Sequence, residues 1–487
     1  MPRTPALALS VAASLLFSGC AVGPNYVTPP KAVADSFHGS AALKRQKAVD
    51  AEELASWWTG FHDPLLTQLI SEALSQNLDL AQATARSAQA RAGVAAAGAA
   101  MAPIGAVSGQ AAKSYQSVET PLGRVLNSTP NFDRSGSSYE VNASASWELD
   151  IAGGLRRERE SALAEYQASE AGIAAVRLTV AAATADVYVQ IRGLQARLAI
   201  AQDQVKTEEG ILAKVRLLNL KGLAADSTVR QAEASASEAR AAVPALEAAL
   251  EGALNALDVL LGTPIGSHRA ELSEPAGLPT PPSLNAVGTP ADLLRRRPDL
   301  IVAERRLASA TARIGVAVAE YYPKLSLNAL LGSATTLTGG NLFSNGANQS
   351  AASLGLRWRL FDFGRINAQI DQAKGQEAEA LAAFKLAALR ATEDVETSVY
   401  TMERRTEQAS AIAAATASLR NARASTEAAL QRGTLSQIEL LQADKAVLRA
   451  ADAEVLARTE SARAAILAFK SLGGGWTVQD PRLAVAD

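Results

Sequence analysis

Identical residues recur in the first and second halves of the chain at two closely similar spacings. Four earlier pairs of identical residues, running from Asp79 and Asp299 to Pro103 and Pro323, are 220 positions apart. Six later pairs are 211 positions apart, so the first copy of the repeat is nine residues longer after Pro103. The extra residues lie in a segment rich in Pro, Gly and Asn, which we interpret as an extended turn region. Constant spacing of such residues predicts an internal duplication and two copies of one structural unit. The later pairs are Trp147 and Trp358, Leu149 and Leu360, Gly153 and Gly364, Gly222 and Gly433, Gln231 and Gln442, and Gly262 and Gly473.

Long helices are predicted in both copies, because proline is absent from residues 131–243 and 324–480. A helix from Gly153 to Leu220 would be about 100 Å long, at roughly 1.5 Å per residue. Its apolar residues recur at steps of three, four or seven, which is typical of coiled-coil packing. We therefore predict that each copy ends in a helical hairpin, turning at Gly222 in the first copy and at Gly433 in the second.

Period-two alternation predicts strands in the remaining part of each copy. Apolar and polar residues alternate over Tyr139–Asp150 and over Ala352–Leu360, and partner strands are expected after Pro103 and Pro323. Segments of about ten residues with one polar face suit a transmembrane barrel with lipid outside and water inside. A half-buried hairpin of a soluble protein would show the same alternation.

The first twenty residues have the features of an export signal. Arg3 provides a positive start, Ala6 to Phe17 form an apolar stretch, and the only cysteine, Cys20, follows. This stretch is too short to span a bilayer. Phe17 to Cys20 resembles a bacterial lipobox, so we predict a lipid on Cys20; an ordinary signal peptide would instead leave a free thiol. Ala21 then implies sorting to the outer membrane, where acyl chains anchor the protein without spanning the bilayer.

The export signal, the lipid anchor and the lack of another hydrophobic core for these strands to pack on favour the transmembrane barrel over the soluble hairpin. Four strands cannot close one, since small barrels need about eight. Three chains would supply twelve strands that continue into twelve helices. The predicted fold class is therefore an internally duplicated α+β membrane protein: a trimeric 12-stranded outer-membrane β-barrel, with four strands per chain, continued by a long periplasmic α-helical coiled-coil barrel.

The composition argues against several other functions. A net charge of -2 gives no reason to expect nucleic acid as a partner. A single cysteine excludes internal disulfides and cysteine clusters, and three widely spaced histidines do not suggest a metal site. We find no Walker motif, zinc signature or Ser/His/Asp pattern, so we predict no enzyme, no catalytic or metal-binding residue, and no cofactor other than the covalent lipid.

Six proline residues in 263–292 mark a linker between the copies. The predicted order is a signal peptide (1–19), a lipidated N-terminal segment (20–62), a first repeat (63–262), the linker (263–292), a second repeat (293–476) and a C-terminal tail (477–487). β-Hairpins are expected at about 104–150 and 323–362, and helical hairpins at about 153–262 and 364–472.

Short motifs spread over nearly the whole mature chain share the order and spacing of one family. They are Cys20–Tyr26, Trp57-Trp58 with Phe61 and Asp63-Pro64, Arg296–Leu300 with Ala303-Glu304, Ile314–Ala317 leading to Tyr322-Pro323, Leu360–Asp362 with Gly364-Arg365, and Leu472–Trp476. With them the chain resembles the trimeric outer-membrane efflux lipoproteins related to TolC, OprM and NodT. The resemblance implies a homotrimeric conduit through the outer membrane and periplasm, docked onto a periplasmic membrane-fusion adaptor and an inner-membrane transporter of the RND type.

The resemblance also implies a gated periplasmic entrance near the second hairpin turn, where carboxylates ring the opening. Glu439, Gln442 and Asp444 are the gate candidates, with Gln442 at a position where relatives often carry Asp. We expect Glu439 to supply the ring, since three carboxylates around one axis repel each other and attract cations; alternatively, Glu439 and Asp444 are ordinary solvated helix residues. Adaptors are expected to touch the hairpin tips at Gly222 and Gly433. The competing hypothesis for the whole chain is a periplasmic coiled-coil lipoprotein that acts as an adaptor or structural partner and forms no pore.

Overall fold

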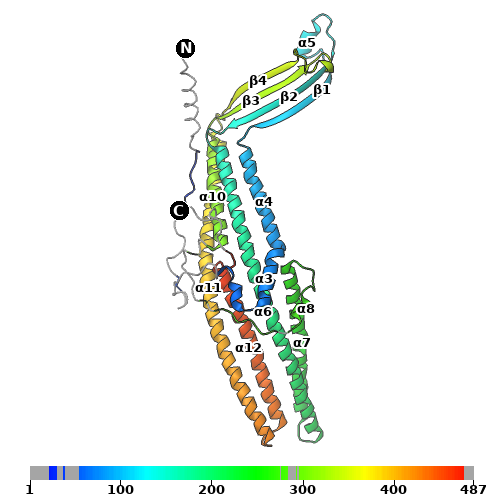
Figure 1. Cartoon of the computed structure of the whole chain (residues 1–487), viewed down its shortest axis with the longest axis vertical. Helices are drawn as coiled ribbons and strands as arrows, with labels where there is room; N and C mark the ends of the chain where they lie inside the picture. Colours follow the sequence, from blue (N-terminus) through cyan, green and yellow to red (C-terminus); the bar gives the residue numbers. More distant parts are fainter. Residues whose placement is uncertain are drawn as a thin grey trace. The chain divides into compact units, whose positions relative to one another are not determined.

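The computed structural model describes residues 21–29, 37–38, 54–274, 276–282, 284, 292 and 296–476 of the chain (Figure 1). The predicted signal peptide, the lipidation site Cys20 and the tail 477–487 lie outside these residues. The chain forms two compact units that are interleaved in the sequence. The first unit comprises residues 1–28, 88–167 and 304–382, and the second comprises 29–87, 168–303 and 383–487. Both predicted repeats therefore contribute to both units.

The first unit contains a four-stranded antiparallel sheet with the strand order β1-β2-β3-β4 (Figure 1). Its strands are β1 (Ile104–Tyr115), β2 (Ser135–Leu149), β3 (Lys324–Thr335) and β4 (Asn348–Arg357). Each repeat supplies one hairpin, and the pairing of β2 with β3, in which Leu149 lies opposite Leu325, joins the hairpins into one sheet. Residues that lie opposite each other on antiparallel strands share a face of the sheet. In this register the apolar residues of β2 and of β3 therefore lie on the same face.

Two local features of this sheet differ from the sequence-based expectation. The connection from β1 to β2 contains a short helix, α5 (Pro121–Asn127), where we expected an extended turn. Thr120 accepts a hydrogen bond from the backbone N–H of Gly123, and Pro121 occupies the first turn, so the segment has a helix start of its own. In addition, β4 ends at Arg357 although the alternation continues to Leu360, because the chain turns away at Phe361, whose φ is 64°.

Long helices make up most of the rest of the described chain. They are α4 (Leu78–Ala99), α6 (Gly154–Leu220), α7 (Asp226–Leu261), α10 (Pro298–Ala319), α11 (Phe363–Gln431) and α12 (Gln437–Ser471), with the shorter α3 (Pro64–Gln76), α8 (Arg269–Leu272), η1 (Trp57–Phe61) and η2 (Gly339–Asn341). Helices α6 and α11 have 67 and 69 residues and occupy matching places in the two repeats. Pro244 lies inside α7 without ending it.

The main apolar core lies in the second unit. Tyr188 and Ile191 of α6 are fully buried there together with Leu257 of α7 and Ile466 of α12. The ring of Trp57 in η1 stacks on Phe469 with 5.5 Å between the ring centroids. Among the described residues, α6 alone has an 18-residue window that is apolar enough to cross a membrane, and half of that window is buried inside the protein. The apolar composition of this window is equally compatible with a helix that is buried in the protein core.

Glycine allows α6 and α12 to approach closely at one point of this core. A Cβ atom added to Gly193 would lie 2.4 Å from Oγ1 of Thr459, whereas one added to Gly172, also in α6, would meet nothing within 4 Å. Contacts under 3 Å force the side chain or the helices to shift. The two glycines therefore have different roles although they share one helix.

We predict that Gly193→Ala destabilises the protein by about 1–3 kcal/mol through overpacking against Thr459. Gly172→Ala, the matched control, should be neutral or stabilising by up to about 1 kcal/mol, since Ala favours a helix more than Gly does. Thermal unfolding of the detergent-purified variants measures both effects. Equal midpoints for the two variants would contradict the close approach.

Candidate functional site

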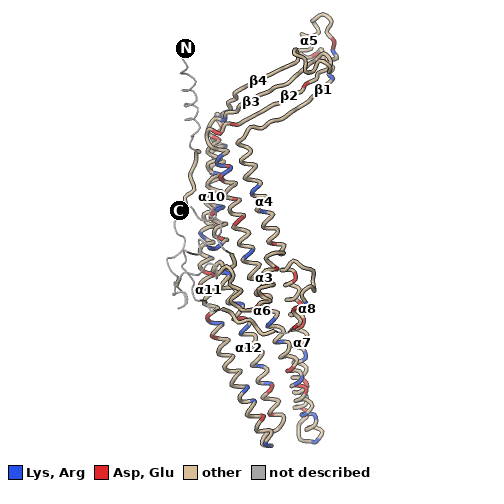
Figure 2. The backbone as a smooth tube through the Cα atoms, viewed as in Figure 1, with Lys and Arg blue, Asp and Glu red and all other residues tan. Residues whose placement is uncertain are grey.

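The two faces of the sheet differ in polarity. One face carries large apolar side chains that are exposed in the single chain: Val107, Leu327, Leu331, Leu354 and Leu356. On the other face the hydroxyl of Ser146 donates to the side-chain carbonyl of Asn328 over 2.8 Å, and Gln349 donates to Asn142. The strands are nearly free of charge between their ends, in contrast to the helices (Figure 2). A sheet with one solvated and one apolar exposed face is suited to separate water from lipid.

The residues that follow Cys20 are fixed to the first turn of α6. The backbone N–H of Val22 donates to the carbonyl of Ala152 over 3.0 Å. The buried guanidinium of Arg157 donates to the carbonyls of Ala21, Val22 and Gly23 and, over 2.7 Å, to the side chain of Asn25. The point of predicted lipid attachment is thus next to a segment that one arginine holds through four acceptors.

Two further contacts explain why this segment has its particular sequence. Gly23 has a φ of 89°, and a Cβ atom on it would lie 2.5 Å from the Cα of Gly315 in α10. Tyr26 donates its hydroxyl proton to Glu304 over 2.9 Å, and burial together with this carboxylate raises the pKa of the Tyr26 hydroxyl. Sequence reasoning identified the motif from Cys20 to Tyr26 as a family match but did not predict these contacts.

Both helical hairpins of the second unit turn at a left-handed glycine. Gly222, between α6 and α7, has a φ of 71°, and Gly433, between α11 and α12, has a φ of 74°. At the first tip, the side chain of Asn219 donates to the carbonyl of Ala224 over 2.9 Å and closes the turn. Leu220 and Leu223 are 84% and 72% exposed beside it. A closed turn with two solvent-exposed leucines is a small apolar surface on a rigid support.

The gate candidate Glu439 caps the start of α12. Its carboxylate accepts hydrogen bonds from the backbone N–H of Ser436 over 2.6 Å and from its hydroxyl over 2.9 Å, while Ser436 caps Glu439 in return. The backbone and then the side-chain hydrogen bond from Ser436 lower the pKa of the Glu439 carboxyl. Glu439 is therefore exposed, ionised and held in one orientation, which is compatible with either a ring carboxylate or a helix cap.

The other two gate candidates lie on the same helix in different surroundings. Asp444 accepts a hydrogen bond from Nε of Arg423 in α11 over 2.7 Å, so its charge is balanced within the chain. Gln442 is exposed. The structure thus brings the three candidates to the first turns of α12, and of the two carboxylates only Glu439 has no basic partner among the described residues.

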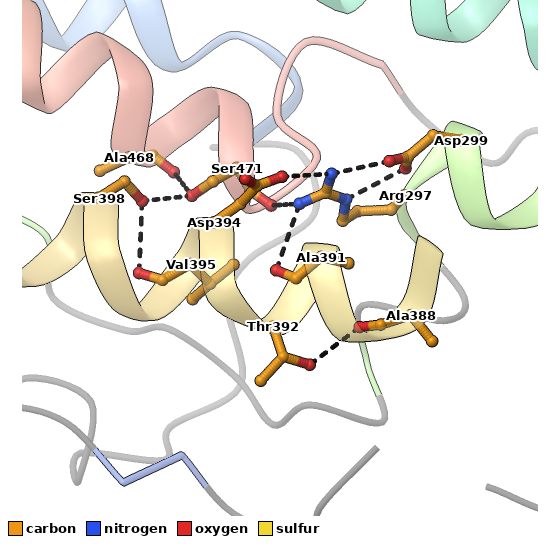
Figure 3. Close-up of polar contacts among 10 residues, drawn as sticks. All are labelled: Arg297, Asp299, Ala388, Ala391, Thr392, Asp394, Val395, Ser398, Ala468 and Ser471. Atoms are coloured by element: carbon orange, nitrogen blue, oxygen red, sulfur yellow. Dashed lines mark hydrogen bonds and ion pairs between the residues drawn. The ribbon is translucent and has the colours of Figure 1, made fainter. Parts of the chain in front are cut away.

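A partly buried arginine links three helices of the second unit, as Figure 3 shows. Arg297, whose side chain is 12% exposed, donates to Asp299 over 2.7 Å and to Asp394 over 2.9 Å. It also donates to the carbonyls of Ala391 in α11 and Ser471 in α12. Sequence reasoning missed this link, because its partners in α11 and α12 lie far away in the sequence.

Comparison with known proteins connects these features to a family. A model of the outer membrane efflux protein family matches residues 69–263 and 289–474. The chain belongs to this family. It is 33% identical to nodulation protein T of Rhizobium leguminosarum bv. trifolii over 393 residues, 80% of each protein, and 30% identical to the pyoverdine export outer membrane protein OpmQ of Pseudomonas putida over 481 residues, 99% of each. The solved structure of the outer-membrane channel OprN superimposes with a TM-score of 0.81 at 30% identity, covering 94% of this chain and 100% of that chain.

Membership of the outer membrane efflux protein family confirms the resemblance and the predicted fold class, a trimeric β-barrel continued by a long helical barrel. The chain is an outer-membrane channel component of a tripartite efflux system and extends from the outer membrane into the periplasm. Family members are transport channels rather than enzymes, and they work with periplasmic adaptors and inner-membrane pumps. The adaptor-like hypothesis without a pore fits these findings less well.

Proposed function

We propose that the chain forms a passive homotrimeric duct whose solutes are delivered by an inner-membrane transporter of the RND class through a membrane-fusion adaptor. The observation that carries this proposal is the sheet with an exposed apolar face and a polar face. Such a sheet is stable when three copies close it, with lipid on one side and water on the other. The chain has no nucleotide-binding motif, so the partner pump must provide the energy.

Substrate selection in this proposal belongs to the pump. Two relatives that align over most of the chain have names that refer to nodulation and to pyoverdine export. A channel type that serves systems with different roles does not need solute-specific binding sites in its helical wall. The entrance and the interior of the barrel can still favour one sign of charge.

We also propose that Cys20 carries the lipid. The support is the fixed position of residues 21–25 on Arg157, which would hold an acyl chain on Cys20 beside the first unit. The acyl chains would then anchor a protein whose strands do the spanning.

The proposed gate lies at the start of α12, with Glu439 as the ring carboxylate and Gln442 and Asp444 nearby. Three ionised Glu439 side chains would repel each other and attract cations. The alternative is that Glu439 serves only as the capping residue of α12. The tips at Gly222 and Gly433 are the proposed adaptor contacts, and opening would be a population shift between closed and open helix arrangements.

Labelling of single cysteines separates a pore from an adaptor. We expect Ser353→Cys, on the polar face, to react in membranes with a water-soluble maleimide, and Leu354→Cys, on the apolar face, to be protected from it, because a thiol surrounded by lipid does not ionise. If both cysteines react equally with the water-soluble reagent, the barrel is excluded. Wild-type protein is the control, because a lipidated Cys20 has no free thiol.

The hairpin tips should be needed for export but not for assembly. Replacing Leu220 and Leu223 by serine removes two exposed apolar side chains, so trimer abundance in the outer membrane should be unchanged while export falls at least tenfold. A transport assay in cells that express the cognate pump measures this, with immunoblotting of the trimer. The matched control is Leu163→Ser, an exposed leucine of α6 in the other unit. Normal export by the tip variant would exclude this docking site.

Glu439→Gln distinguishes the ring from the cap. Glutamine keeps a hydrogen-bond acceptor for the backbone N–H of Ser436, so the helix start should survive, but the charge is lost. We expect cation preference in single-channel recordings to fall by about two- to fivefold, the effect of roughly 1 kcal/mol per charge. Unchanged preference would leave Glu439 as a cap alone. The control is Ser436→Ala, which keeps the charge but weakens the cap by about 1 kcal/mol.

A further inference from the structure

Basic side chains gather on the polar face where β3 begins and β4 ends. Lys324 and Arg357 lie directly opposite each other in the register of these strands. They line a cleft of about 250 Å³ together with Glu320, Tyr322 and Arg359. The cleft is large enough for an inorganic oxyanion or for the head of a larger anionic molecule.

Two of the three cations in this cleft are paired. Lys324 contacts one carboxylate oxygen of Glu320 at 2.5 Å, with Glu148 at 4.0 Å, and Arg359 donates to the other oxygen of Glu320 over 2.8 Å. Arg359 also binds Asp362. Each oxygen of Glu320 therefore has a cationic partner, and no ion pair joins this carboxylate, the only one lining the cleft, to Arg357.

Arg357 differs from its neighbours because it has no partner. Among the residues that the structure describes, no hydrogen bond or ion pair involves its guanidinium, and the residue is exposed. Within the same described ranges the hydroxyl of Tyr322, which is 46% exposed, is also unpaired. The cleft thus offers a planar bidentate donor and a phenol, beside two cations that are already paired with carboxylates.

The neighbouring copy in the trimer would not neutralise Arg357. Strand β4 is an edge of the four-stranded sheet, and β1 is the other edge. When three sheets close into a barrel, β4 of one copy pairs with β1 of the next. Residues 104–115, which form β1, include no Asp or Glu. Because the register puts Arg357 opposite Lys324 and next to Leu356 of the apolar face, its side chain belongs to the face that lines the water-filled interior.

We propose that the cleft around Arg357 is an anion-binding site inside the channel, which takes carboxylate- or phosphate-bearing solutes as they pass. Arg357 is the bidentate ligand, and Tyr322 donates a further hydrogen bond. Three copies form a ring of such sites on the inner wall of the barrel. The inference rests on the proposed function, since it requires the polar face to line a conducting pore.

The chemistry of arginine suits this role. A guanidinium binds the two oxygens of a carboxylate or phosphate in parallel, and its charge is permanent at any physiological pH. A site in a channel must bind strongly enough to admit an ion and weakly enough to release it. An exposed arginine in a hydrated interior meets both conditions, because water screens the attraction.

The test compares Arg357→Gln with Lys113→Gln in planar bilayers of neutral phosphatidylcholine. Lys113 is also exposed and in the same sheet, but the register places it on the opposite face. Inorganic phosphate is added from the barrel side, so that it reaches the cleft without passing the periplasmic entrance. We expect the phosphate concentration for half-block of the chloride current to rise by about two- to fivefold in Arg357→Gln, the effect of roughly 1 kcal/mol, and to stay unchanged in Lys113→Gln.

A second measurement does not need an open gate. Broadening of the phosphate ³¹P resonance by the detergent-purified trimer should be lost in Arg357→Gln and retained in Lys113→Gln. Equal behaviour of the two variants in both measurements overturns the site. If Arg357→Gln alters the current only when phosphatidylglycerol is present, the anion is a lipid headgroup and the solute site is likewise overturned. A wild-type trimer that conducts no current at all, even with the entrance opened by mutation, refutes the proposed function instead.

Discussion

Unpaired strand edges cannot face lipid, and the rest of this structure depends on that constraint. In hydrocarbon every backbone N–H and C=O group needs a partner, so a sheet in the membrane must close on itself. The sheet of this chain has two free edges, β1 and β4. Only further copies can pair them, which makes the trimer a condition of folding in the membrane. The duplication supplies the two hairpins, and the pairing of β2 with β3 joins them within one chain.

Small side chains are the second condition, because they let long helices lie close together. Ala181, Ala185 and Ala462 are completely buried in the second unit, and Gly193 admits Thr459 where any Cβ would collide. Close backbone approach gains dispersion contacts along the helix without large apolar side chains. This explains how a chain with only 5% aromatic residues forms a core.

The sequence predicts features that are local or periodic, and fails for contacts between distant residues. Alternation and helical spacing are visible in any window, so strands, long helices and the turns at Gly222 and Gly433 follow from them. Arg157 and Arg297 bind residues more than 90 positions away, and no local pattern encodes such pairs. The cap on α12 is different, since Ser436 and Glu439 have the spacing of a capping box and could have been recognised.

Arg357 can remain without an ionic partner because its surroundings differ from those of the paired cations between the helices. Between helices, cations meet carboxylates across chain segments: Arg463 binds Asp186, and Lys445 binds the buried Glu208. Breaking the second pair would leave the buried carboxylate of Glu208 uncompensated, which is strongly unfavourable. On the lipid face of a barrel an unpaired arginine would cost about 2–4 kcal/mol near the bilayer midplane. On the polar face water solvates it at little cost. Near the bilayer midplane a charge is therefore tolerated on the polar face and excluded from the lipid face, and Arg357 lies on the polar face, where its free cation is available to a solute.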